Sequence, residues 1–337
     1  MAFIIFICIF EVIFLKIPNP FDFTREGKGI KKSNSYDVDA TTLSGFFVTY
    51  TRKFWSLSTA NIFYILVNFP IFFLLFAFGG FLDIVSPAPV TPMFQPVYGI
   101  SLYGANPLAS ALLGALSGET TVSVTSTGSY VFYALSALLF ITFGLGNAGL
   151  AAVTRNCCRG DMVFVGQDFF GAIKRNWKQA VVLGAIDLGL FGLFVFNFTF
   201  YSVNGMTMMI YASIALLVVY FFMRFYMYTI LVTFELSVFK IIKNSVIFAL
   251  IGFARNIVAT FGIILVLALN WYIVMLFMPV GVLLPFLITL ATFSFVATCA
   301  VYPNIKKYMI DPYYSSSSSK KSSSSSFSEE PVFKDRG

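Results

Sequence analysis

The chain has 337 residues, of which 58% are hydrophobic and only 11% charged, and 42 of them are phenylalanine. A soluble domain has about 25% charged residues, so this composition excludes an ordinary soluble fold and indicates an integral membrane protein. The net charge of +7 does not indicate nucleic-acid binding, because the basic residues form no long run and lie beside apolar stretches, where they can contact lipid headgroups.

Residues 1–19 are predicted to be a separate apolar extension. As a helix, residues 2–15 would reach only about 21 Å, against a hydrocarbon core of about 30 Å. No basic stretch precedes them and no small-residue cleavage site follows, so a secretory signal peptide is not expected. Two interpretations stay open, an interfacial helix and an upstream extension from a misassigned start codon.

Six apolar stretches within residues 20–310 predict an all-α, polytopic membrane bundle with six transmembrane helices. The predicted spans are 59–82, 130–153, 180–201, 209–231, 256–278 and 281–302. In the external loop 83–129, the apolar stretch from Leu108 to Leu116 is expected either to lie on the outer surface or to re-enter the membrane. Residues 311–337 are serine-rich and are expected to be a disordered cytoplasmic tail.

The positions of the positive charges predict the orientation of the bundle. All 22 Lys and Arg residues lie before span one, between spans two and three, from the end of span four to span five, or after span six. The loops between these regions hold none. The positive-inside rule therefore places both termini in the cytoplasm.

Two cytoplasmic stretches, residues 166–178 and 235–250, are predicted to form short amphipathic helices. Both interleave apolar residues with charged ones, as expected for a helix that lies at the membrane surface or docks onto a partner. The candidate docking residues on them are Lys174, Arg175, Trp177, Glu235, Lys240 and Lys243.

Asp187 and Arg224 are the clear ionisable residues inside predicted spans. They belong to spans three and four, and they lie about 18 and 19 residues from the centre of the turn that joins these spans. At 1.5 Å per residue they share nearly the same depth, about 10 Å inside the cytoplasmic boundary, so we expect them to face each other. A static ion pair and a functional gate or coupling site both fit this placement, as does an Arg224 that snorkels to the interface.

Other polar or small residues in the spans are expected to serve packing. Asn147, Asn197 and Asn270 are predicted to make hydrogen bonds between helices, and Gly144 with Ala148 is predicted to allow a close helix approach.

No residue pattern predicts catalysis, a metal site or a cofactor. The chain has no histidine, and its four cysteines are expected to be reduced and unspecialised. Nucleotide-binding and hydrolase motifs are missing from the sequence, and the chain is therefore not expected to be an enzyme or to power transport by itself.

Several short motifs resemble those of a known family. The most specific stretch runs from Asp168-Phe169-Phe170 through Asn176-Trp177-Lys178-Gln179-Ala180 to Asp187. Further similar positions are Phe23 to Ile30, Phe54-Trp55 with Asn61 and Pro70, Gly149 to Ala152, Arg159-Gly160-Asp161, Phe234-Glu235-Leu236, Lys243-Asn244-Ser245 and Val332 to Gly337. Over residues 20–310 the chain resembles the YesL-like family of bacterial integral membrane proteins, a family of unknown function. The apolar segment 1–15, the long loop 83–129 and the serine-rich tail depart from the family pattern.

The resemblance implies a plasma membrane of the Gram-positive, Firmicutes type and an accessory role beside an ABC-type carbohydrate uptake system. The leading hypothesis is therefore a non-enzymatic membrane protein that docks onto such a system through residues 166–178 and 235–250. The alternative is an autonomous transporter or channel for a small solute, with Asp187 and Arg224 lining its path. A membrane enzyme acting on lipid has little support. The expected partners are the lipid bilayer, ABC transporter subunits and a second copy of the chain.

Overall fold

The fold is that of a computed structural model, which describes residues 42–89, 108 and 119–312. The chain divides into two units, residues 68–142 and residues 1–67 together with 143–337. The predicted extension 1–19, most of the stretch 108–116 and the tail beyond Pro312 lie outside the described residues, so these predictions stay untested.

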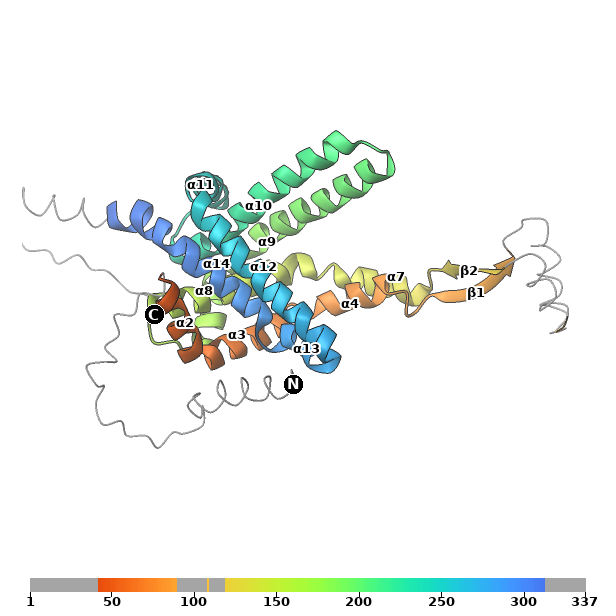
Figure 1. The fold of residues 1–337 in the computed structure, drawn as a ribbon, viewed down its shortest axis with the longest axis horizontal. Coiled ribbons are helices and arrows are strands. Elements are labelled where there is room, and N and C mark those ends of the chain that lie inside the picture. The colour runs from red at the N-terminus through yellow and green to blue at the C-terminus, as the bar shows by residue number, and fades with distance from the viewer. Residues whose placement is uncertain (1–41, 90–107, 109–118, 313–337) are drawn as a thin grey trace, which may run out of the picture. The chain divides into compact units, whose positions relative to one another are not determined.

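The larger unit is helical in the part of the chain that the structure describes (Figure 1). Its helices are α2 (Leu43–Arg52), α3 (Phe54–Val67), α8 (Leu139–Arg159, from Phe143 onward), α9 (Val165–Val203), α10 (Thr207–Thr233), α11 (Val238–Ile251), α12 (Phe253–Leu276), α13 (Met278–Leu284), the π-helix η3 (Pro285–Thr289), α14 (Leu290–Ile305) and the π-helix η4 (Lys306–Ile310).

Four of the described helical segments are long and apolar enough to cross a membrane. They are α9, α10, α12 and the run of helices from Met278 to Ile310. Two helix pairs, α3 with α4 (Pro70–Phe78) and α7 (Thr127–Ser136) with α8, qualify when each pair is counted as one broken span. The prediction of an all-helical, multi-pass membrane bundle is thereby confirmed, with four to six spans.

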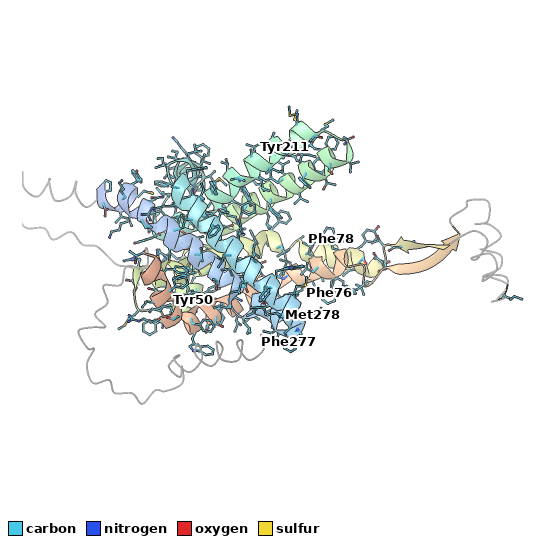
Figure 2. The ribbon with its side chains drawn as sticks, viewed as in Figure 1. Tyr50, Phe76, Phe78, Tyr211, Phe277 and Met278 are labelled. Atoms are coloured by element: carbon cyan, nitrogen blue, oxygen red, sulfur yellow. The ribbon has the colours of Figure 1, made fainter. Side chains whose placement is uncertain are left out.

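The outside of these helices is apolar. At most 33% of the most apolar 18-residue window of each of the four long segments is buried inside the protein. Figure 2 labels Tyr211 on α10 and Phe277 and Met278 at the turn between α12 and α13, and these side chains are 66%, 58% and 67% exposed. Large exposed apolar surfaces of this kind are stable against lipid and not against water.

The predicted amphipathic helix 166–178 is not separate from span three. It forms the first third of α9, a continuous helix of 39 residues. At 1.5 Å per residue α9 is about 58 Å long, nearly twice the thickness of the hydrocarbon core. No proline interrupts the segment, so the predicted amphipathic stretch and span three form one continuous helix.

The smaller unit contains α4, α7 and a two-stranded antiparallel ribbon, which the sequence had not predicted in loop 83–129. Strand β1 (Ile84–Pro89) pairs with β2 (Glu119–Val124), with Ile84 opposite Val124. The ring centroids of Phe73 and Phe132 lie 5.5 Å apart, and they join α4 to α7.

A carboxylate fixes the start of α7 within this smaller unit. The Ser129 hydroxyl donates a hydrogen bond of 2.6 Å to Asp83, and the Ser126 side chain caps the helix by accepting from the Ser129 N–H. Together these bonds satisfy polar groups at the point where the ribbon ends and the helix begins.

Several basic helix ends of the larger unit are linked by direct contacts. The Lys53 ammonium before α3 donates to the Asp161 carbonyl after α8, at 3.0 Å. The Arg155 guanidinium near the end of α8 donates to the Val232 carbonyl at the end of α10, at 2.7 Å. The C-terminal carbonyls of a helix carry partial negative charge, so this arginine also interacts favourably with the dipole of α10. These contacts bring the start of α3 to the end of α8, and the end of α8 to the end of α10.

Candidate functional site: an intramembrane carboxylate

The site lies in the antiparallel hairpin of α9 and α10, which run side by side in Figure 1. A tight turn at residues 204–206 connects them, and Gly205 has a φ of +66° there. This left-handed conformation strains residues with a Cβ atom, so glycine permits the two helices to return directly alongside each other.

Asp187 is fully buried on α9, and three side chains of α10 surround its carboxylate. The Arg224 Nε lies 3.0 Å from Oδ2 of Asp187, and the Tyr228 hydroxyl donates to the same oxygen at 2.8 Å. The Tyr220 hydroxyl donates to Oδ1 and also contacts the Asp187 backbone carbonyl at 3.1 Å. We call these four residues the Asp187 centre.

The three partners of the carboxylate occupy one face of α10. Tyr220, Arg224 and Tyr228 are spaced four residues apart, so their side chains lie one above another along the helix. The structure thus brings together Asp187 and Arg224, as the hairpin geometry predicts. The two tyrosines were missed, although their spacing from Arg224 was the signal that could have identified them.

The guanidinium of Arg224 has fewer hydrogen-bond partners than the Asp187 carboxylate and is more exposed. Its carbon lies 5.3 Å from the centroid of the Phe143 ring, in a cation–π arrangement. Tyr64 on α3 interacts electrostatically with both charges and hydrogen-bonds Asn147 on α8. The Arg224 side chain remains 30% exposed, whereas Asp187 is 0% exposed.

Helix α8 approaches α9 closely near Asp187, because both helices carry a glycine where they cross. A Cβ atom at Gly144 would overlap the Ala180 carbonyl, and one at Gly184 would overlap the backbone of Gly144. Ala148 is also fully buried. This close approach places α8 and α9 against each other one turn before Asp187.

Chemically, the Asp187 centre is a buried ion pair whose carboxylate is hydrogen-bonded by protein side chains. Three donors around one carboxylate replace the water that the anion loses on burial. Such an arrangement stabilises an ionised carboxylate and holds α9 and α10 in one register. The described residues contain no group of three or more His, Cys, Asp or Glu side chains that could bind a metal ion.

The candidate docking residues are all on the surface and apart from the Asp187 centre. Lys174, Arg175 and Trp177 lie in the N-terminal third of α9, where Trp177 is 54% exposed. Lys240 and Lys243 are exposed on α11, and Glu235 is exposed just before it.

The predicted asparagines differ in their partners. Asn270 on α12 donates to the Thr289 hydroxyl of η3 at 3.3 Å, a contact between helices. Asn147 donates to the Phe143 carbonyl of its own helix at 2.8 Å as well as contacting Tyr64. The Asn197 side chain makes no hydrogen bond within the part of the chain that the structure describes.

A second buried polar cluster, which sequence reasoning missed, surrounds Asn61 on α3. The Asn61 amide nitrogen donates to the Pro285 and Phe286 carbonyls at 2.9 and 2.7 Å, and its oxygen accepts from the Ala291 N–H at 2.8 Å. The nearby Ser58 hydroxyl donates to the Leu287 carbonyl at 2.9 Å. We call these contacts the Asn61 cluster.

The Asn61 cluster satisfies the backbone where the last span is irregular. Pro285 has no N–H, and the π-helix η3 replaces the regular hydrogen-bond pattern of an α-helix. Inside a membrane, freed backbone groups must find partners within the protein. Asn61 and Ser58 supply them from a neighbouring helix.

One comparison with known proteins gives a match. Residues 124–198 match a family described as protein of unknown function, DUF624. The matched segment contains Gly144, Gly184 and Asp187 but not the three residues of α10 that surround the carboxylate. No curated protein and no solved structure matches the chain. Residues 124–198 are therefore similar to a family of unknown function, and the membrane character of the chain rests on its long apolar helices.

Proposed function

We propose that the chain is a non-enzymatic integral membrane protein that docks onto a partner through the N-terminal third of α9, residues 165–177. The observation that carries this proposal is the length of α9. About 20 residues of a helix suffice to span a membrane, and α9 has 39, so its N-terminal residues extend past the bilayer. A continuous helix presents these residues at a fixed distance and orientation.

The exposed side chains in the N-terminal third of α9 suit protein recognition. Phe170 and Trp177 are 49% and 54% exposed, and Lys174 and Arg175 are exposed between them. Aromatic and arginine side chains are enriched at the energetically important positions of interfaces. The family resemblance suggests the partner, namely subunits of an ABC-type carbohydrate uptake system in a bacterial plasma membrane.

A mild-detergent pull-down from the native membrane tests this proposal. Transporter subunits are expected to co-purify with the wild-type chain and to be lost when Lys174→Glu is combined with Arg175→Glu. The matched control is Lys306→Glu with Lys307→Glu, which reverses two exposed charges on η4. Retention of the partner in the α9 variant, or equal loss in both variants, would contradict docking through α9.

An alternative function is the transport of a small solute along the Asp187 centre. The observation that favours it is the unused donor capacity of Arg224. Its Nε contacts Asp187, whereas its terminal nitrogens make no hydrogen bond within residues 42–89 and 119–312, and the side chain is 30% exposed. A passing solute could use these donors. This hypothesis predicts that Asp187→Asn abolishes flux in liposomes without unfolding the protein, and normal flux in that variant would remove Asp187 from the mechanism.

A further inference from the structure

Helix α11 has two faces with different surroundings. Its buried face, which includes Ile241, Ser245, Phe248 and Ala249, contributes to a core shared with α10. Its opposite face has no protein cover in the described residues. There Phe239 is 77% and Leu250 64% exposed. A helix with one packed and one uncovered apolar face requires a further apolar or amphipathic environment.

Five exposed cations lie on α11 or on the elements next to it. Lys240 and Lys243 lie on α11 itself, Arg255 lies at the start of α12, and Lys306 and Lys307 lie on η4, all exposed. Tyr308 of η4 packs against Phe248 of α11, with ring centroids 6.2 Å apart, so the two elements are neighbours. None of the five forms an ion pair within the described part of the chain. The nearest acidic residues along the chain are Glu235 and Asp311, which leaves an excess of positive charge.

The polarity of α11 changes along its length, from an N-terminal half that contains lysines to an apolar C-terminal end that precedes a candidate membrane span. Both lysines are in its N-terminal half, while the apolar Leu250 and Ile251 are at its C-terminal end. Gly252 follows, and α12, a candidate membrane span, begins at Phe253. Because α11 directly precedes this candidate span, we expect its C-terminal end at the hydrocarbon boundary and its lysines at the level of the lipid headgroups.

We propose that the outer face of α11, with Arg255 and the two lysines of η4, binds anionic phospholipid headgroups of the inner leaflet. We call this the α11 surface. Amphipathic helices with cations and bulky apolar residues lie in the membrane interface, and long lysine side chains can extend from an apolar face to phosphate groups. This assignment is an alternative to docking of a protein onto residues 235–250, and it is independent of docking through α9.

The cations of the α11 surface are expected to set its affinity for anionic lipid, and this affinity can be measured. A basic residue near an anionic membrane surface contributes about 1 kcal/mol, which corresponds to about a fivefold change in affinity. Neutralising Lys240, Lys243, Lys306 and Lys307 by glutamine should therefore weaken binding of phosphatidylglycerol at least tenfold and leave binding of phosphatidylcholine unchanged. Native mass spectrometry of the full chain, titrated in detergent with each lipid, measures both affinities.

A matched set of substitutions separates a specific site from general attraction. Arg52, Lys174, Arg175 and Lys178 are four exposed cations assigned to the same side of the membrane. Their replacement by glutamine should change the affinity for phosphatidylglycerol less than twofold. An equal loss in both sets, or no loss in either, would overturn the proposal. It would also be overturned if the α11 variant bound the lipid normally and instead lost a co-purifying protein.

A smaller variant covers the case in which the fourfold substitution fails to fold. Lys240→Gln with Lys243→Gln changes only two side chains that point away from the core, and it should lower the affinity for phosphatidylglycerol about five- to twentyfold. Replacing the same two residues by arginine should restore it. Failure of arginine to restore binding, with helicity unchanged, would contradict an electrostatic role.

Discussion

The Asp187 centre and the Asn61 cluster are two buried polar sites whose groups find their hydrogen-bond partners in different ways. Both bury polar groups inside the larger unit, and both satisfy them with a neighbouring helix. At the Asp187 centre, side chains of α10 surround a charge. In the Asn61 cluster, a neutral amide binds the backbone of an irregular helix. The difference is that loss of one partner leaves a buried charge in the first case and unpaired neutral groups in the second.

The largest effect is expected from Arg224→Gln. This substitution leaves the Asp187 carboxylate buried without its cation, and breaking a buried ion pair in this way costs about 3–5 kcal/mol. The free energy of unfolding in detergent or in lipid nanodiscs measures it. A loss below about 1 kcal/mol would mean that the two tyrosines alone stabilise the carboxylate.

A somewhat smaller loss is expected from Asn61→Ala. Three hydrogen bonds to the backbone around η3 disappear, and groups left unpaired in an apolar environment cost about 1–3 kcal/mol each, so we expect a total loss of about 2–4 kcal/mol after local relaxation. Ser58→Ala removes a single bond to the same helix and serves as the control, with an expected loss of about 1 kcal/mol. If both variants lose the same amount, Asn61 has no special role in supporting the π-helix.

Gly184→Ala tests the close approach that places Asp187. The added Cβ atom would overlap the backbone of Gly144 and force α8 and α9 apart, which costs about 1–3 kcal/mol. The control is Gly189→Ala on the same helix, where a Cβ atom would meet nothing within 4 Å. That variant should be neutral or slightly stabilised, because alanine favours helices more than glycine does. Equal behaviour of the two variants would show that the crossing is not tightly packed.

The smallest expected effect is that of Tyr228→Phe. It removes one hydrogen bond of 2.8 Å to the Asp187 carboxylate and keeps the ring, with an expected loss of about 1.5 kcal/mol. Tyr211→Phe on the exposed outer part of α10 is the control and should leave the free energy of unfolding unchanged. A loss as large as that of Arg224→Gln would indicate that the tyrosine, rather than the arginine, dominates the stabilisation of the carboxylate.

The difference between the charged side chains of the Asp187 centre and the backbone partners of Asn61 explains which of the two sites the sequence could predict. Asp187 and Arg224 are rare charges in apolar runs, and their equal distances from the turn predict a common depth. The partners of Asn61 are backbone groups, which have no sequence identity, so only the structure reveals them. The charge pattern and apolar lengths predict the class of fold. Residues 166–178 were expected to form a separate helix because they are charged and the span is apolar. Polarity does not mark a helix end, and no proline or other strong break separates the two.

A double-mutant cycle on Asp187→Asn and Arg224→Gln, with the free energy of unfolding measured in nanodiscs, tests the Asp187 centre most directly. If the centre is a structural charge pair between α9 and α10, each single variant is strongly destabilised and the double variant regains about 2 kcal/mol or more relative to their sum. Additive losses would contradict this account, because they would mean that the two side chains are neighbours without stabilising each other.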